Sequence, residues 1–172
     1  MKPGKISDLE NVLFRNPQST AFAILDGASI PDLLDQLYKK RLQFDSLYKG
    51  HLTPDMAEVV PYIVQLEKDC PFTRWALESL VSKSCGILGS SMNSLRILKK
   101  YFRQMLDAEM PDGKIVSFRF YDPRIFNILL TSASEAELTG YFSLVDEYLV
   151  ANEDSEMLAH RIMSNQLMSE QI

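Results

Sequence analysis

The sequence has 172 residues, of which 46% are hydrophobic and 24% are charged, and its formal net charge is −5. This length suits one domain with its own core, and the composition is too apolar for a disordered chain. No stretch approaches the roughly 18 apolar residues of a membrane-spanning helix, and the N-terminus lacks a signal-peptide pattern, so we expect a cytoplasmic protein without membrane insertion.

The charge is unevenly distributed along the chain. Residues 1–124 carry a net charge of +2, and residues 125–172 carry a net charge of −7. Nucleic acids and anionic membranes bind basic surfaces, so this acidic end argues against both as partners. We expect its acids to form a solvated face, with a docking surface for a basic protein as the alternative. The acidic residues between Arg124 and Arg161 are Glu135, Glu137, Asp146, Glu147, Glu153, Asp154 and Glu156.

The sequence contains two cysteines, Cys70 and Cys85. Their spacing matches neither a zinc motif nor a disulfide framework. We therefore expect two buried free thiols, and we predict neither a metal site nor a cofactor.

Apolar periodicity and turn residues predict alternating helices and strands in the first half of the chain. A helix is expected to begin at Ser7, whose capping-box pattern with Glu10 is typical of a helix N-terminus. A compact apolar run over 20–29 predicts a central buried strand that ends at Asp26. The remaining elements are predicted to be helices from Ser29, from Thr53 and over 71–83, and strands over 42–50, 59–67 and 85–91.

The second half is predicted to open with the strongest helix, over 92–110, and to turn at 111–113 into a strand over 115–121. Strands that alternate with helices predict an α/β fold, and the tight turn implies at least one antiparallel pairing. We therefore predict one α/β domain over residues 1–143, with a mixed β-sheet flanked by helices. An acidic C-terminal extension over 144–172, not an independent domain, is expected to follow. The later elements are predicted to be helices over 124–132 and 134–142, a strand over 143–151 and an amphipathic tail helix over 155–170.

Few residues have the spacing of a catalytic or ligand-binding site. The segment from Gly86 to Ser91 could hold an anion between a strand and a helix, but it lacks the lysine of a phosphate-binding loop. We therefore favour a tight strand-to-helix turn there. His51 and His160 have no patterned partner and are expected to be exposed to solvent. Trp75 lies on an apolar helical face and is predicted to belong to the core.

Two aspartates, Asp26 and Asp122, lie at the ends of predicted strands. Paired carboxylates in such positions can bind a metal ion or transfer protons. However, Asp-Gly after a strand and Asp-Pro before a helix are also typical turn and cap sequences, because short carboxylates accept hydrogen bonds from nearby backbone N–H groups. We favour the structural role for both.

The segment FRFYDPR, residues 118–124, combines charged and aromatic side chains in a regular order. In a strand, Phe118 and Phe120 would share one side while Arg119 and Tyr121 share the other. The pattern therefore predicts an apolar anchor on one side and a polar cluster on the opposite side.

The end of this segment is expected to start a helix. Asp122 is predicted to cap it, and Pro123 suits its first turn. Arg119 or Arg124 is expected to pair with Asp122 or Asp26 through bidentate hydrogen bonds. On this interpretation the segment organises the fold, with partner contact as the second possibility and catalysis as a distant third.

The same segment resembles the signature of a bacterial family of type VI secretion effector adaptors, often called Tap or Tec chaperones. Other stretches agree with that family in the same order, and together they cover residues 20–130. They are AILDGA (23–28), LYKG (47–50), VVPYIVQL (59–66), RWALES (74–79), CGILGSS (85–91), LRILKKYFRQML (95–106) and MPDGKIVSFRFYDPRIFNILL (110–130).

The resemblance implies a cytoplasmic adaptor that holds a toxic effector protein and loads it onto the spike protein VgrG of the secretion apparatus. It implies no catalysis, no cofactor and no metal. Members commonly have a helical second lobe after the signature, whereas 48 residues follow Arg124 here, so this lobe would be small. The residues that the resemblance marks as structural or partner-binding are Asp26, Phe118, Arg119, Tyr121, Asp122, Pro123 and Arg124.

Two alternatives to an adaptor remain open from the sequence. One is a small hydrolase that uses Asp26, Asp122 and Arg119, and the other is an immunity protein that binds a toxin. An adaptor should have an exposed apolar groove, because chaperones shield apolar segments of their clients. An enzyme should have a polar pocket with perturbed carboxylates.

Overall fold

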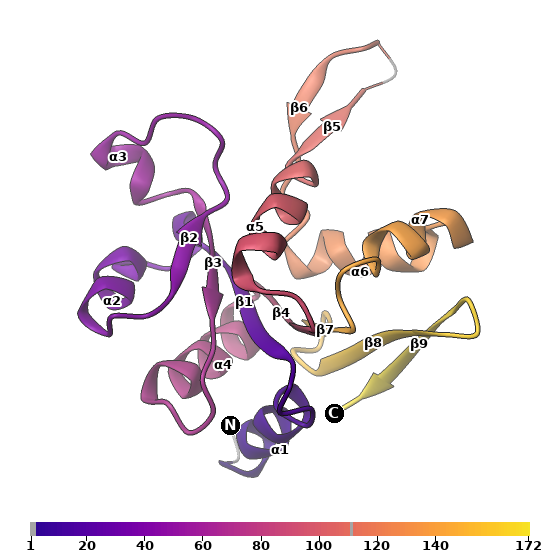
Figure 1. Ribbon diagram of the computed structural model, residues 1–172, viewed down its shortest axis with the longest axis horizontal. Coiled ribbons are helices and arrows are strands. Elements are labelled where there is room, and N and C mark those ends of the chain that lie inside the picture. Colours follow the sequence, from indigo (N-terminus) through magenta and orange to yellow (C-terminus); the bar gives the residue numbers. More distant parts are fainter. Residues whose placement is uncertain (1–2, 111) are drawn as a thin grey trace.

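The computed structural model describes residues 3–110 and 112–172 and shows a β-sheet with helices on both faces (Figure 1). In the described part of the chain, the main sheet has seven strands in the order β2-β3-β1-β4-β7-β8-β9. They are β1 (Thr20–Asp26), β2 (Phe44–Ser46), β3 (Pro61–Gln65), β4 (Gly86–Ser91), β7 (Glu147–Ala151), β8 (Met157–Met163) and β9 (Gln166–Gln171).

The helices divide between the two faces of this sheet. One face is covered by α1, α2 and α4, and the other by α5, α6 and α7. A short 3-10 turn, η1 (Gly27–Ser29), follows β1, and α3 lies beside β2 and β3 (Figure 1). The helices are α1 (Pro3–Leu13), α2 (Leu33–Lys39), α3 (Pro54–Ala57), α4 (Pro71–Lys83), α5 (Leu95–Gln104), α6 (Pro123–Ser132) and α7 (Glu135–Tyr141).

Strand β1 shows why the core has two halves. Side chains alternate along a strand, so Ala23 and Leu25 pack towards α1, α2 and α4, whereas Phe22 and Ile24 pack towards α5 and α6. Both sets are fully buried, which requires a covering layer on each face. The predicted single α/β domain is therefore confirmed, and β1 is the central buried strand that its apolar run predicts.

The predicted mixed sheet is wrong, because every strand pairing in residues 3–110 and 112–172 is antiparallel. Strands β3 and β4, joined by α4, do run in the same direction. However, β1 lies between them and is antiparallel to each. The crossover through α4 therefore creates no parallel pair.

The predicted helix over 92–110 and strand over 115–121 are both shorter in the structure. Helix α5 ends at Gln104, and the chain then forms a separate two-stranded hairpin of β5 (Asp107–Glu109) and β6 (Ile115–Ser117). The hairpin projects from the body of the molecule (Figure 1). Gly113, with φ of +80°, lies in its turn, where a left-handed conformation favours glycine. Pro111 of the predicted turn lies outside the described residues.

The predicted tail helix is also wrong, because residues 157–171 form the hairpin of β8 and β9. Ser164 and Asn165, both with positive φ, make its two-residue turn, a geometry that matches the twist of antiparallel strands. Residues 144–172 thus contribute three strands to the main sheet instead of a helical extension. Within the described residues, no helix is long and apolar enough to cross a membrane.

The acidic end is not uniformly solvated, because Glu147 is 1% exposed. One of its carboxylate oxygens lies 2.5 Å from Arg15 and 3.0 Å from Arg161. These ion pairs connect the segment after α1 to strand β8. For Glu147, the expectation of a solvated acid is therefore wrong, whereas Glu153 and Asp154 are exposed as predicted.

Candidate functional site

The C-terminal end of β1 places Asp26 in a buried polar position. The residue is 5% exposed, and its carboxylate accepts hydrogen bonds from the Ala28 backbone N–H at 3.2 Å and the Ser29 hydroxyl at 2.5 Å. These bonds hold the turn of η1 against the strand. The Asp-Gly turn that the sequence predicts here is confirmed.

Asp26 also pairs with Arg119 of the signature segment, residues 118–124. The Arg119 Nη2 atom lies 2.5 Å from the Asp26 Oδ2 atom, and the guanidinium carbon lies 5.9 Å from the centre of the Tyr121 ring. Burial, and then the charge of Asp26, raise the pKa of Tyr121. The tyrosine is therefore a neutral wall of the site, and the arginine is held between a carboxylate and an aromatic ring.

The alternation predicted for this segment holds although residues 118–122 are not a strand. Phe120 is fully buried against Phe102 of α5, with the two rings stacked at 5.8 Å between centroids. Arg119 and Tyr121 point instead into the polar cluster around Asp26. Phe118 is half-buried and packs against the same core cluster as Phe120, and it also lines a second surface, described below.

Asp122 caps α6, as the sequence predicts. Its Oδ1 atom accepts hydrogen bonds from the Arg124 backbone N–H and from Arg124 Nε, both at 3.0 Å. The Arg124 Nη2 atom lies 2.6 Å from the other carboxylate oxygen. These bonds from Arg124 lower the pKa of Asp122. Pro123 occupies the first turn of the helix.

These side chains surround one polar pocket of about 240 Å³, which we call the Asp26 pocket. Each of its two carboxylates already pairs with an arginine, so neither is free to accept a proton from a substrate. Burial raises the pKa of the Cys85 thiol to about 11, which leaves it protonated and weakly nucleophilic near neutral pH. The pocket is lined by Asp26, Ser29, Lys83, Ser84, Cys85, Arg119, Tyr121, Asp122 and Arg124.

No group of three or more histidine, cysteine, aspartate or glutamate side chains with metal-binding geometry occurs among the described residues. The candidate hydrolase residues Asp26, Asp122 and Arg119 are nevertheless brought together, which the sequence alone left open.

The other candidate residues are dispersed. The turn predicted within residues 86–91 is wrong, because Gly86–Ser91 is strand β4 throughout and pairs with β1 and β7. The Phe22 ring and the Glu147 carbonyl leave no room for a side chain at Gly89. His51 is exposed, as predicted. His160 is 1% exposed, so the prediction of a solvent-exposed residue is wrong; its ring nitrogens lie 2.8 Å from Ser169 Oγ and 3.1 Å from Asn127 Oδ1.

The remaining predictions concern the cysteines and the tryptophan. Cys85 is buried, whereas Cys70 is only half-buried, and both are free thiols. Trp75 packs against the first half of the core from a partly buried position.

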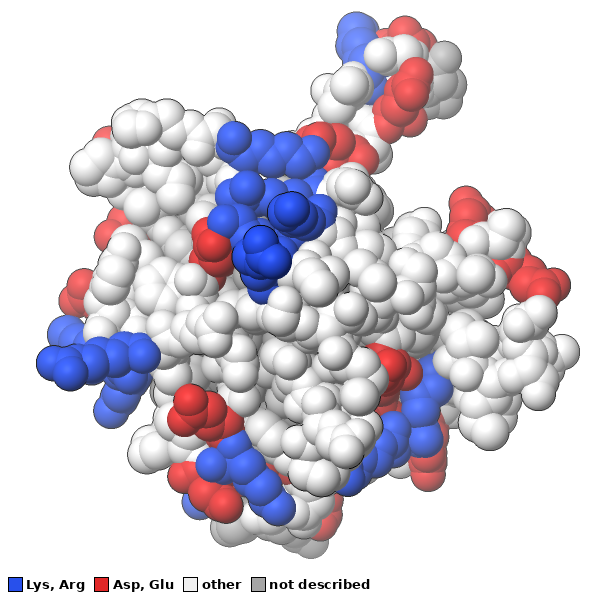
Figure 2. All heavy atoms as spheres, viewed as in Figure 1, with Lys and Arg blue, Asp and Glu red and all other residues white. Residues whose placement is uncertain are grey.

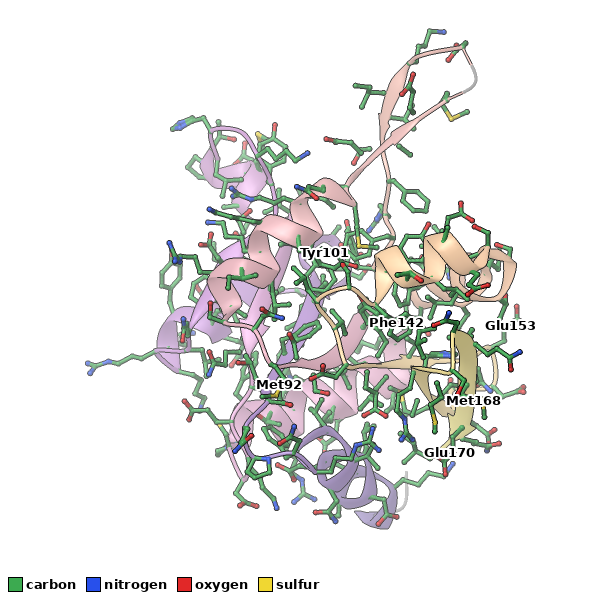
Figure 3. The ribbon with its side chains drawn as sticks, turned by 45° about the vertical axis from the view of Figure 1, so that its right-hand side comes forward. Met92, Tyr101, Phe142, Glu153, Met168 and Glu170 are labelled. Atoms are coloured by element: carbon green, nitrogen blue, oxygen red, sulfur yellow. The ribbon has the colours of Figure 1, made fainter. Side chains whose placement is uncertain are left out.

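A second and larger concavity lies on the opposite side of α5 from β2. It has a volume of about 540 Å³ and is mostly apolar, and we call it the α5–α7 groove. The Tyr101 hydroxyl donates to the carbonyls of Gly140 and Tyr141 at 2.9 and 2.7 Å, and so ties α5 to α7 along the groove (Figure 3). The groove is lined by Tyr101, Gln104, Met105, Asp107, Ala108, Phe118, Leu129, Glu137, Gly140 and Tyr141.

The projecting hairpin extends this apolar surface. Ala108 pairs with Val116 across the hairpin, so both side chains share the face that carries Phe118. Val116 is 39% exposed. The groove could not be predicted residue by residue from the sequence, because its apolar positions on α5 and α6 have the same helical spacing as core positions.

Comparison with known proteins identifies one family. The family model DUF4123, described as a domain of unknown function, matches residues 21–140. This range includes the Asp26 pocket and, except for Tyr141, the α5–α7 groove. No curated protein and no solved structure matches the chain significantly. The family is associated with type VI secretion effector adaptors. The chain therefore belongs to the DUF4123 family.

Proposed function

We propose that this protein is a cytoplasmic adaptor that binds a type VI secretion effector and brings it to the spike protein VgrG. The observation that carries the proposal is the open α5–α7 groove, whose lining residues except Tyr141 lie in the segment that matches the family model. Adaptors hold client segments whose apolar side chains would otherwise be exposed to water. An open apolar groove on a folded domain has the chemistry for that task.

The groove and the hairpin together make a surface of varied rigidity. Tyr101 is fixed by two carbonyls, and Phe118 lies two positions before the buried Phe120. Among the described residues of the outer hairpin, none belongs to the core, and Met110 near its tip is 46% exposed. A client segment would thus meet a fixed floor and a projecting, adjustable side wall.

The test compares neighbouring residues on opposite faces of the hairpin. Val116→Glu places a charge on the apolar face, whereas Ile115→Glu places the same charge on the other face, where Ile115 is 72% exposed. Neither residue belongs to the core, so both variants should fold. Each variant is co-expressed with a toxin and a VgrG encoded beside its gene, and the complexes are purified and weighed by light scattering.

We expect the wild type and Ile115→Glu to hold the toxin and bring it to VgrG, and Val116→Glu to lose the toxin. Equal loss or equal retention in the two variants would reject the apolar face as the binding surface.

The immunity-protein alternative predicts another result. In that case this protein would bind the toxin and inhibit its activity, and the complex would not include VgrG.

The hydrolase remains the second candidate because Asp26, Asp122 and Arg119 line one pocket. The involvement of both carboxylates in arginine pairs weighs against it. A divalent ion bound stoichiometrically by the purified protein and lost in Asp26→Asn would decide for the enzyme.

A further inference from the structure

Helix α5 presents a basic face that the α5–α7 groove does not use. Arg96, Lys100 and Arg103 follow one another at spacings of four and three residues, which places them on one side of the helix. Arg96 and Lys100 are exposed to solvent. The buried side chains of α5, such as Leu98 and Phe102, lie on the opposite side.

Neighbouring cations enlarge this face but are already neutralised. Lys99 pairs with Asp45 of β2, and Lys49, which follows β2, pairs with Asp107 of the hairpin. Figure 2 shows the resulting cluster of basic side chains over α5, with acidic groups only at its margins. Within residues 3–110 and 112–172, Arg96, Lys100 and Arg103 form no ion pair with a carboxylate. Three positive charges on this face are thus left without a counter-charge.

Arg103 is held in place by the backbone next to β2. Its Nη2 atom donates to the Ser46 carbonyl at 3.0 Å and to the Tyr48 carbonyl at 2.8 Å. A guanidinium fixed in this way loses little conformational entropy when it meets an anion. The face is therefore partly preorganised, unlike a set of freely rotating surface lysines.

We propose that this face, Arg96, Lys100 and Arg103 of α5, docks an acidic segment of a partner protein. Charge complementarity carries the choice of occupant, because the unpaired charges here are all positive. The overall charge of −5 and the acids of the projecting hairpin, Asp107, Glu109 and Asp112, disfavour a long polyanion such as DNA. A short acidic peptide segment would contact α5 without covering those acids.

The basic face lies on the same helix as the apolar groove, so one protein partner could contact both. The other side of α5 carries Tyr101 and Met105, which line the α5–α7 groove. A partner that straddles α5 would place acidic side chains on one side of the helix and apolar ones on the other. The proposal rests on the adaptor function, and it adds the charge of the segment that the adaptor recognises.

The test uses a fluorescein-labelled oligoglutamate peptide as the probe and the full chain as the receptor. Binding is measured by fluorescence anisotropy at about 0.1 M and about 1 M salt, where the screening length falls from about 10 Å to about 3 Å. We expect binding at the lower salt that weakens at least about tenfold in Arg96→Glu/Lys100→Glu and at the higher salt.

The matched control is Lys40→Glu/Lys68→Glu, which makes the same change in net charge at two exposed residues far from α5 in the sequence. It should bind the peptide as the wild type does, after a small correction for net charge. No binding at the lower salt, or equal loss in both double variants, would overturn the proposal. Tighter binding of a DNA duplex than of the peptide would overturn it in favour of a nucleic-acid surface. The peptide experiment does not use the effector, so it tests the basic face of α5 alone. The hairpin variants test the adaptor function, and either proposal can fail without the other.

Discussion

Arg119 and Asp26 stand 93 positions apart in the sequence, yet the Arg119 Nη2 atom lies 2.5 Å from the Asp26 Oδ2 atom. The pair joins the segment before α6 to the end of the central strand. Its two members differ in environment, because the Asp26 side chain is 7% exposed and the Arg119 side chain is 51% exposed. Loss of one member should therefore cost more than loss of the other.

Asp26→Ala should lower the free energy of unfolding by about 2 to 3 kcal/mol, because it leaves the Ser29 hydroxyl and the Ala28 N–H without their acceptor as well as removing the ion pair. Arg119→Gln should cost about 1 kcal/mol or less, because an exposed partner is screened by water. Urea unfolding of both variants measures the difference. Equal costs would mean that the aspartate is not the organising member of the pair.

Asp122→Ala should lower the free energy of unfolding by about 1 to 2 kcal/mol through loss of the cap on α6 and of the Arg124 pairing. Asp122→Asn keeps an oxygen that can accept from the Arg124 N–H, so it should recover most of that loss. Thermal and urea unfolding compare the two. Unchanged stability together with lost partner binding would show that the signature segment is an interaction surface and not an organiser of the fold.

His160 should make the protein less stable at mildly acidic pH. Burial lowers the pKa of His160 from 6.5 to about 4. Below pH 6.5 the unfolded chain takes up a proton that the folded state refuses, so stability falls between pH 6.5 and 4 and then levels off. Between pH 7 and pH 5 the loss is expected to be about 2 kcal/mol.

The comparison for this prediction is His160→Gln, which has no titrating ring. Urea unfolding at the two pH values should show a smaller acid-induced loss in the variant than in the wild type. The same pH dependence in both proteins would assign the loss to other groups.

The hydrogen bonds of Asn127 identify the tautomer of His160. The Asn127 side-chain nitrogen donates to the Ala151 carbonyl at 2.8 Å, which leaves the Asn127 side-chain oxygen to accept from His160 Nε2. The neutral ring therefore carries its proton on Nε2.

A chain that ends at Ala151 should fail to fold stably. It would lack β8 and β9 and so lose the buried side chains of Met157, Ala159 and His160. Loss of this many core contacts is expected to cost more than about 3 kcal/mol. Circular dichroism and dye binding to exposed apolar surface test this, with a chain that ends at Ser164 as the control, because it loses only the mostly exposed β9. Native-like unfolding of the chain ending at Ala151 would show that residues 152–172 are dispensable.

Local signals in the sequence predicted many of the elements. The apolar run of β1 and the periodicity of α4 each lie within one element, and so does the Asp-Pro start of α6. Each therefore reports the local backbone directly. For Arg119 and Arg124, charge alone predicts Asp26 or Asp122 as the partner. In the structure, Arg119 pairs with Asp26 and Arg124 pairs with Asp122.

Tertiary structure decided what local periodicity leaves ambiguous. The segment 155–170 has apolar residues compatible with a helix, but β7 offers an unpaired edge, and the turn at Ser164 and Asn165 lets β8 and β9 extend the sheet from it. The burial of His160 and Glu147 depends on that extension, because His160 lies in β8 and Arg161 of β8 pairs with Glu147. Their other partners, Asn127 and Arg15, are distant in the sequence. Sequence by itself therefore determined the domain class and the local elements, because their causes are short-range. The sheet edge, the buried polar pairs and the α5–α7 groove depended on contacts between distant segments, which only the folded chain brings together.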